Sequence, residues 1–361
     1  MGNYTQNLNL YKTDMQSDGN DTFSFDRDLN ENWDKIDAKV GELSGQSANI
    51  NLDNLTDEAI DYIRSTTDGL YKPVDLSVKH AEEIRTKHGG DVWAWIQSRI
   101  RTTNFSGIHI GDYIPVQLSG GTIGGAVTIP ANQQHYMQVA GIDTYYNSGD
   151  TPIPHHIDFF SRETIEATCT WNEGNTNNGT SAEPNPWLSS RIYALCNGVN
   201  NYSTSAQGGL KHGLNCSSGG ILQMLPTNCQ NVLIDVRSWV EEQYDSSKQT
   251  VQPTGNKWAN IGKIFIPHEV EVCGYQPNSY NRGEAGNIDN LTRNLTKMYP
   301  LFRQQTRVKL GANTGARSNY WLRCPSGYAS TVVCGVHAYG DVGNHHATTE
   351  TISVCFGFRI G

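Results

Sequence analysis

The first 70 residues are mostly polar and carry one narrow apolar stripe. Apolar side chains recur at the spacing i, i+4, i+7 and i+11, which places them on one face of a helix: Leu29, Trp33, Ile36 and Val40. Asp26 is placed to cap the start of this helix and Gly41 to end it. Because a short helix with so narrow a stripe is marginal alone in water, we expect it to pack against copies of itself or another protein.

Residues 71–105 contain a second amphipathic segment, DVWAWIQSRI. Its apolar positions cover a broad helical face formed by Val92, Trp93, Trp95, Ile96 and Ile100. A face of this width needs a large apolar surface to cover it. We therefore predict that residues 71–105 are a linker whose helix docks onto the domain that follows.

In the remaining residues, 106–361, apolar and polar positions alternate as they do in half-buried strands. This alternation predicts strands within residues 108–118, 136–146, 263–275, 330–339 and 352–360. Helical spacing predicts one helix near residues 186–196 and another from Pro226 to about Tyr244. Strands interrupted by two helices, with long polar loops between them, indicate an α+β domain.

The net charge, the length of the apolar stretches and the N-terminal sequence argue against several classes of protein. The 361 residues carry a formal net charge of −9 and no run rich in lysine or arginine, which argues against nucleic-acid binding. No apolar stretch approaches the roughly 18 residues of a membrane span. The N-terminus also lacks the basic and then apolar layout of a secretory signal. We therefore expect no membrane insertion and no conventional export, so that the chain is made and folds in the cytoplasm.

The eight cysteines lie between Cys169 and Cys355, and none occurs in a CxxC pair or in the paired spacing of a zinc site. Eight in 361 residues is too dilute for a disulfide scaffold. We expect most of them to be small buried side chains with reduced thiols, and we expect no metal site and no cofactor.

The N-terminal sequence carries a resemblance to a known class of protein. The distinctive runs are LNLYKTD, DGNDTF and LNENWDKID, which together span about 35 residues. They resemble the tail-attachment segment of phage tail-fibre and receptor-binding proteins from Gram-positive hosts. The resemblance implies that residues 1–70 attach to other phage tail proteins, and that the chain is a homotrimer, since tail fibres commonly trimerise.

The main body resembles a second phage family, the C-type-lectin-like domains related in fold to the formylglycine-generating enzyme. The matching runs include IGDYIPV, HHIDFFSRETI, KIFIPHEVEVCGY, NYWLRCP and SVCFGFRIG. The resemblance implies a C-type-lectin-like domain over residues 106–361, displayed at the phage tail tip of the virion. In some relatives a retroelement diversifies the C-terminal stretch, so this chain is a candidate for such a variable protein.

The corresponding stretch here runs from about Arg317 to Ile352 and is rich in Tyr, Ser, His and Asn, the adaptable contact residues of binding loops. The family presents this stretch on one exposed surface. The resemblance therefore implies that a ligand contacts Asn319, Tyr320, Tyr328, Ser330, His337, Tyr339, Asp341, Asn344, His345 and His346.

No catalytic constellation emerges from the motifs. His155 and His156 lack a third ligand at metal-site spacing. Cys324 and Cys334 lie in the region where formylglycine-generating relatives use a cysteine pair with copper, but nothing else in the sequence matches that chemistry. Because a fold does not carry a function by itself, we expect no enzyme activity.

These observations predict a non-catalytic phage tail protein that recognises a glycan or protein on the host cell surface. One alternative is a tail-spike depolymerase, which would need two carboxylates about 5–10 Å apart across a cleft. Its candidates are Asp158, Glu163, Glu166, Glu269 and Glu271. The other alternative is a purely structural tail-tip protein.

Overall fold

The computed structural model describes residues 3–4, 11–12, 31–48, 72–180, 183–198, 214–216, 218–240, 257–279 and 295–361. The chain divides into two compact units, residues 1–70 and residues 71–361. The second unit combines helices and strands, as the α+β prediction requires. In the part of the chain that the structure describes, no helix is both long enough and apolar enough to cross a membrane.

The first unit contains a short antiparallel strand pair, β1 (Asn3–Tyr4) with β2 (Tyr11–Lys12), and the helix α1 (Glu31–Ala48). The predicted helix is present, but the expected end at Gly41 is wrong because α1 continues to Ala48. A glycine ends a helix only where the backbone turns left-handed; inside a helix it merely costs about 1 kcal/mol. Leu29 and Asp26 lie outside the described residues.

Two of the three described side chains in the apolar stripe of α1 are exposed. Trp33 is 60% exposed and Val40 is 52% exposed, while Ile36 between them is half-buried. These three side chains share one helical face, as their spacing predicts. Exposed apolar side chains on one helical face form a surface on which a partner can pack.

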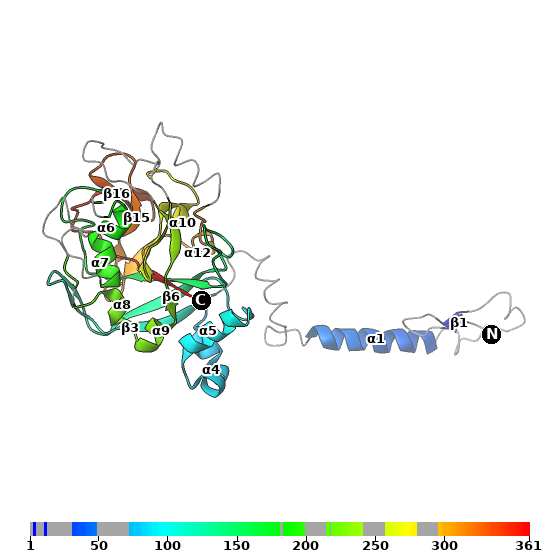
Figure 1. Cartoon of the computed structure of the whole chain (residues 1–361). Helices are drawn as coiled ribbons and strands as arrows, with labels where there is room; N and C mark the ends of the chain where they lie inside the picture. The colour runs from blue at the N-terminus through cyan, green and yellow to red at the C-terminus, as the bar shows by residue number, and fades with distance from the viewer. Residues whose placement is uncertain are drawn as a thin grey trace, which may run out of the picture. The chain divides into compact units, whose positions relative to one another are not determined.

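The second unit is built on a six-stranded antiparallel sheet (Figure 1). Its strands follow the order β12 (Ile264–Phe265), β18 (Gly357–Ile360), β7 (Ile157–Ser161), β6 (Gln133–Ile142) and β3 (Tyr113–Leu118), and β9 (Leu233–Ile234) also pairs with β18. The C-terminal strand β18 thus lies inside the sheet, with Phe358 opposite Phe159 of β7. The predicted strands at 108–118, 136–146 and 352–360 correspond to β3, β6 and β18.

The other described strands of the second unit form four smaller sheets. Two have three strands: β14 (Arg317–Ser318), β13 (Lys309–Gly311) and β8 (Glu163–Thr164) form one, and β15 (Tyr320–Pro325), β16 (Val332–Val336) and β17 (Val342–His346) form the other. Two are hairpin-like pairs, β10 (Arg237–Val240) with β11 (Lys257–Asn260) and β4 (Gly121–Ile123) with β5 (Val127–Ile129).

The helices that the structure describes in the second unit are short. They are α3 (Leu76–Lys79), α4 (Ala81–His88), α5 (Val92–Arg101), α6 (Pro186–Ser189), α7 (Arg191–Asn197), α8 (Ile221–Met224), α9 (Thr227–Val232), α10 (Glu269–Cys273) and α12 (Pro300–Gln304). Helices α4 and α5 lie at the opposite end of the body from β15 and β16 (Figure 1). The predicted helix near 186–196 is present as α6 and α7, which are separated at Ser190.

The docked helix predicted at residues 91–100 is α5. Asp91 caps it by accepting hydrogen bonds from the backbone N–H groups of Trp93 and Ala94. Trp93 is buried and packs edge-on against Phe159 and Phe358 of the central sheet. Helix α5 therefore docks onto the central sheet as predicted, and residues 71–105 belong to the second compact unit.

Two of the predicted elements are wrong. The helix expected from Pro226 to about Tyr244 ends at Val232, and the chain continues as β9 and β10. Its apolar residues fit a strand equally well, and pairing of β10 with β11 decides the outcome.

The strand expected over residues 263–275 is also interrupted. It is only two residues long as β12, and helix α10 follows. His268 caps α10, and the Glu271 carboxylate accepts from the His268 backbone N–H at 2.8 Å, closing a capping box. This local start signal overrides the apparent alternation.

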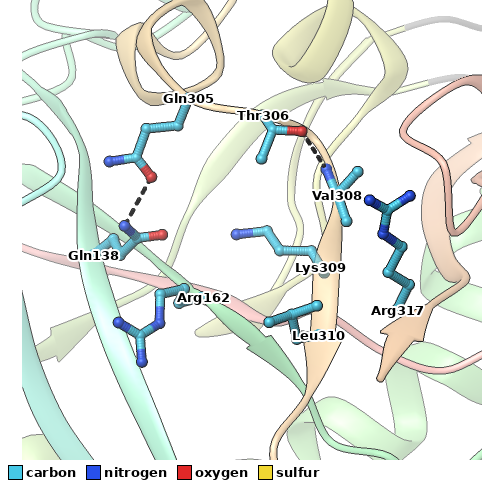
Figure 2. A pocket seen from close by; sticks show the side chains of 8 residues that line it. All are labelled: Gln138, Arg162, Gln305, Thr306, Val308, Lys309, Leu310 and Arg317. Carbon is cyan, nitrogen blue, oxygen red and sulfur yellow. Dashed lines mark hydrogen bonds between the residues drawn. The ribbon is translucent and has the colours of Figure 1, made fainter. Parts of the chain in front are cut away.

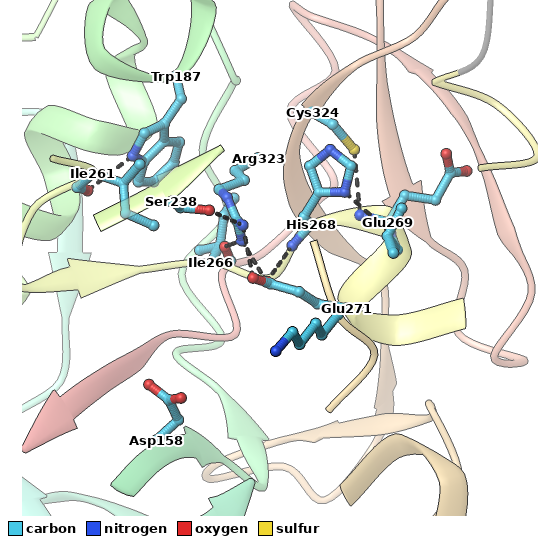
Figure 3. A network of polar contacts seen from close by, with 12 residues as sticks. Asp158, Trp187, Ser238, Ile261, Ile266, His268, Glu269, Glu271, Arg323 and Cys324 are labelled. Carbon is cyan, nitrogen blue, oxygen red and sulfur yellow. Dashed lines mark hydrogen bonds and ion pairs between the residues drawn. The ribbon is translucent and has the colours of Figure 1, made fainter. Parts of the chain in front are cut away.

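Two buried ion pairs cross the body. Arg359 donates from Nε to Asp158 at 2.7 Å. Arg323 pairs with both carboxylate oxygens of Glu271 and also donates to the Ser238 hydroxyl at 3.0 Å (Figure 3). Although burial acts in the opposite direction, the Arg323 charge holds the pKa of Glu271 below its usual range. Buried charges of this kind are tolerated only when their partners are in place.

The buried imidazole of His135 predicts a pH dependence of stability. Its nitrogens lie 2.8 Å from Ser161 Oγ and 2.9 Å from Gln133 Oε1. Burial lowers the pKa of His135 to about 4. The unfolded chain takes up this proton near its ordinary pKa of about 6.5, so the unfolded state is favoured increasingly as the pH falls from 6.5 to 4.

We expect this group alone to remove about 3 kcal/mol from the free energy of unfolding between pH 7 and pH 4. Urea unfolding of the wild type and of His135→Gln at both pH values measures the effect. The variant should lose less stability on acidification than the wild type. Equal losses in both proteins would show that His135 is not responsible.

Candidate functional site

The three-stranded sheet β15–β16–β17 carries the ten residues predicted to contact a ligand, and it divides them. Residues 326–331 connect β15 to β16, and residues 337–341 connect β16 to β17. Because the strands are antiparallel, these two connections lie at opposite ends of the sheet, about 15 Å apart for strands of this length.

One group of predicted residues lies at the 337–341 connection. Tyr339 is 81% exposed there, and Asp341 is also exposed, with Oδ2 4.0 Å from His337 Nε2. Asn319 is half-buried and accepts a hydrogen bond from the Ala338 backbone N–H at 2.7 Å. Asn319 therefore holds the connection in place, while Tyr339 and Asp341 face solvent.

The second group lies at the opposite end of the sheet. Tyr328 is 81% exposed, and His346 is exposed at the end of β17, opposite Val332. Ser330 is half-buried, and its carbonyl oxygen accepts from the Asn177 backbone N–H at 2.6 Å. This group thus presents one aromatic side chain and one imidazole.

Asn344 and His345 lie between the two groups on the outer strand β17. Asn344 is exposed and donates to Asn278 Oδ1 at 3.1 Å. His345 is half-buried, with its ring 4.5 Å from that of His337 and 5.8 Å from Trp321. Burial lowers the pKa of His345 to about 4, so this ring is neutral at pH 7.

The prediction for Tyr320 is corrected. Tyr320 is completely buried as the first residue of β15, so it offers no surface to a ligand. Its hydroxyl donates to the Arg307 carbonyl oxygen at 2.9 Å. Tyr320 therefore anchors residue 307 to β15, and burial raises the pKa of its hydroxyl well above the ordinary value.

Next to the 337–341 connection lies an open pocket of about 410 Å³ that the sequence did not predict (Figure 2). The small sheet β14–β13–β8 supplies its cations. Arg317 is on β14, Lys309 is on β13, and Arg162 directly precedes β8. Strand pairing brings them together, because Leu310 lies opposite both Arg317 and Glu163.

Amide and hydroxyl groups line the rest of this basic pocket. Gln138 donates to Gln305 Oε1 at 2.9 Å on one side, and Thr306 accepts from the Val308 backbone N–H at 3.1 Å on another (Figure 2). Leu310 adds an apolar side chain that is 43% exposed. The pocket therefore combines positive charge, hydrogen-bonding groups and a small apolar surface.

Among the described residues, few carboxylates pair with the positively charged side chains of the basic pocket. Lys309 is only 3% exposed, yet among the described residues its ammonium makes one hydrogen bond, to the Ser161 carbonyl oxygen at 2.8 Å. Arg162 Nε donates to Glu163 at 2.6 Å, and the guanidinium lies 4.0 Å from the centre of the Tyr136 ring. No carboxylate is among the described side chains that line the pocket.

The basic pocket lies next to Tyr339, which stands on the 337–341 connection. The Arg317 guanidinium lies 5.9 Å from the centre of the Tyr339 ring. Gly340 packs against Val308, where a Cβ atom would come within 3.2 Å of Val308 Cγ2 at a φ of +92°. Tyr339 therefore stands at the edge of the pocket, and together they form the candidate functional site.

Sequence reasoning found Tyr339 and Asp341 but missed Arg162 and Lys309. These two cations are distant from each other in sequence, and β13 pairs with β8 in parallel, a long-range contact that periodicity does not reveal. One local feature of the sequence could have identified Lys309. Lys309 lies in a short apolar run, VKL, where a lysine is unusual unless it has a partner.

The candidate carboxylates of a depolymerase are engaged in the protein's own contacts. Each has a protein partner: Asp158 with Arg359, Glu163 with Arg162, Glu166 with Thr314, Glu269 with Ser279 and Glu271 with Arg323. Four of them are buried, and Glu166 is half-buried. These contacts give each carboxylate a structural role.

Glu269, Cys324 and Cys334 form the one group among the described residues whose donor atoms could share a metal ion, since these atoms lie within 4.8 Å of one another. The Glu269 carboxylate already accepts four hydrogen bonds, between 2.7 and 3.0 Å, from Asn278 and Ser279. Its backbone N–H donates to Cys324 Sγ at 3.4 Å (Figure 3). These contacts account for the buried carboxylate without an ion.

Seven of the eight cysteines are buried and Cys273 is half-buried, and all eight are free thiols. Burial raises the pKa of Cys216 to about 12 and that of Cys273 to about 11. A thiol with so high a pKa carries almost no thiolate at neutral pH and is inert. The expectation that most cysteines are buried is therefore met in the structure.

No family model, no curated protein and no solved structure matches the chain.

Proposed function

We propose that this chain is a phage tail receptor-binding protein that recognises a glycan or protein on the host cell surface without catalysis. The observation that carries the proposal is the candidate functional site itself. Tyr339, which is 81% exposed, stands on the short 337–341 connection that Asn319 holds in place, beside the basic pocket. Exposed tyrosines on fixed loops are typical anchors of binding surfaces, because they offer a large contact area at a small entropic cost.

The resemblance of the N-terminal runs to tail-attachment segments indicates where the protein acts. We propose that residues 1–70 join the protein to other tail proteins of the virion and that the apolar face of α1 holds a homotrimer. The exposure of Trp33 and Val40 supports this proposal, since exposed apolar side chains on one helical face offer a surface on which copies of the helix can pack. Three copies then bind a surface with repeated receptors through avidity, even when each contact is weak.

We also propose that residues 106–361 have a C-type-lectin-like fold. The support is the resemblance of the sequence runs together with an antiparallel sheet that contains the C-terminal strand and carries long irregular connections. A fold of this kind hosts many functions, so the function is argued from the site rather than from the fold.

Two alternatives make different predictions. A depolymerase needs two available carboxylates facing a cleft, and its five candidate carboxylates are held by protein partners. A purely structural tail-tip protein has no need of an exposed tyrosine beside a basic pocket. The engaged carboxylates and the exposed tyrosine beside a basic pocket therefore both favour receptor binding.

The test uses the purified full chain with cell walls from a panel of Gram-positive bacteria. Retention on a subset of strains, with no release of reducing sugar, is the expected result. Sugar release would identify a depolymerase instead. Absence of retention and of release on a panel that includes a strain infected by the source phage would favour the structural tail-tip protein.

A further inference from the structure

The basic pocket contains a charge that the described part of the protein leaves unmatched. Lys309 is 97% removed from solvent, since only 3% of its surface is exposed, and its ammonium has a single hydrogen-bond acceptor among the described residues. An ammonium has three N–H donors. Burying such a charge without an anion is costly, so a buried lysine that lines a pocket marks a position where an anion is stabilised.

Two further cations line the same pocket and have donors to spare. Arg162 uses Nε on Glu163, and both of its terminal nitrogens are without a hydrogen bond among the described residues. The Arg317 guanidinium makes no hydrogen bond or ion pair within the described chain and lies near the Tyr339 ring. A planar guanidinium with free N–H groups matches the oxygens of a phosphate or a carboxylate.

The surroundings of these cations indicate what carries the anion. Gln138, Gln305 and Thr306 offer hydrogen-bonding groups of the kind that sugar or polyol hydroxyls use (Figure 2). Tyr339 offers a flat, exposed ring at the pocket's edge, where a sugar ring can pack. The whole chain carries a net charge of −9, so this concentration of positive charge is local and opposes the general repulsion of anions.

We propose that the basic pocket binds an anionic group, a phosphate or a carboxylate, carried on the sugar or polyol chain of a host surface polymer. This inference rests on the proposed function and specifies its ligand class. Lys309 holds the anion from the floor of the pocket, Arg162 and Arg317 close around it, and Tyr339 contacts the adjoining sugar or polyol unit.

The experiment is isothermal titration calorimetry of the full chain with four defined probes: a poly(glycerol phosphate) oligomer, an oligogalacturonate, neutral dextran and inorganic phosphate. We expect saturable binding of one of the two charged oligomers, and none of dextran. The oligomer that binds identifies phosphate or carboxylate as the anion. Binding of neither charged oligomer would overturn the inference, and so would inorganic phosphate binding as tightly as the oligomer, which would indicate a small-anion site.

Single substitutions test whether the oligomer binds in the basic pocket. Arg317→Gln changes an exposed residue and should weaken binding about tenfold or more, as the loss of a charged hydrogen bond does. Lys309→Gln should weaken it further. Arg101→Gln, an exposed arginine of α5 outside the pocket, is the matched control for net charge and should bind like the wild type. Equal affinities for Arg317→Gln and Arg101→Gln would overturn the assignment.

The same variants separate this inference from the proposed function. If Arg317→Gln and Lys309→Gln are retained on host cell walls as well as the wild type, the pocket inference fails while receptor binding stands. If the protein is retained on no cell wall although a charged oligomer binds in the pocket, the receptor proposal fails and the anion site stands.

Discussion

Replacing Arg323 by methionine is expected to lower the free energy of unfolding by about 3–5 kcal/mol. The guanidinium is buried and bonds both carboxylate oxygens of Glu271, the Ser238 hydroxyl and the Ile266 carbonyl oxygen (Figure 3). Without it, the buried Glu271 carboxylate keeps its hydrogen bonds from the Tyr145 hydroxyl and the His268 backbone N–H but loses its arginine partner. Urea unfolding monitored by tryptophan fluorescence measures the loss.

The double variant Arg323→Met with Glu271→Gln provides the control. It removes both charges, so it should recover a large part of the stability that the single variant loses. If the double variant is destabilised by the sum of the two single effects, the ion pair is not a coupled unit and the interpretation of this network is wrong.

A charge placed in the apolar face of α1 is expected to dissociate the proposed homotrimer. Trp33→Glu or Val40→Glu would bury one unpaired carboxylate per chain in the interface, at a cost of several kcal/mol each. Light scattering should show the mass of a trimer for the wild-type full chain and that of a single chain for either variant.

Ala38→Glu is the matched control for this prediction. Ala38 is exposed and lies on the opposite face of α1, and the change adds the same charge. It should leave the trimer intact. A monomeric wild type would refute the trimer, and dissociation by Ala38→Glu as well would show that the effect is general repulsion rather than loss of the apolar interface.

Elements with a wide apolar face or strong local signals could be predicted from the sequence. The helix α5 was predicted because its apolar face is broad, and in the structure Asp91 caps its start. The helix predicted from Pro226 and the strand predicted at 263–275 failed because short apolar runs fit both periods. Strand pairing in one case and a capping box in the other decided between them, and the first depends on contacts distant in sequence.

The candidate site could be predicted only in part. Residue type correctly identified Tyr328 and Tyr339 as exposed side chains, since both stand on connections between strands. It failed for Tyr320, which has the same residue type but begins a buried strand. The basic pocket could not be predicted, because Arg162 and Arg317 meet only through the pairing of β8, β13 and β14.

The central claim is that the end of the sheet β15–β16–β17 that carries Tyr339 contacts the host surface. The most direct test compares retention of the full-length wild type, Tyr339→Ala and Tyr146→Ala on cell walls of a strain that retains the wild type. Tyr146 is also exposed but lies outside both the pocket and the sheet β15–β16–β17. We expect Tyr339→Ala to lose about tenfold or more in apparent affinity and Tyr146→Ala to match the wild type. Retention of Tyr339→Ala at the wild-type level would contradict the account.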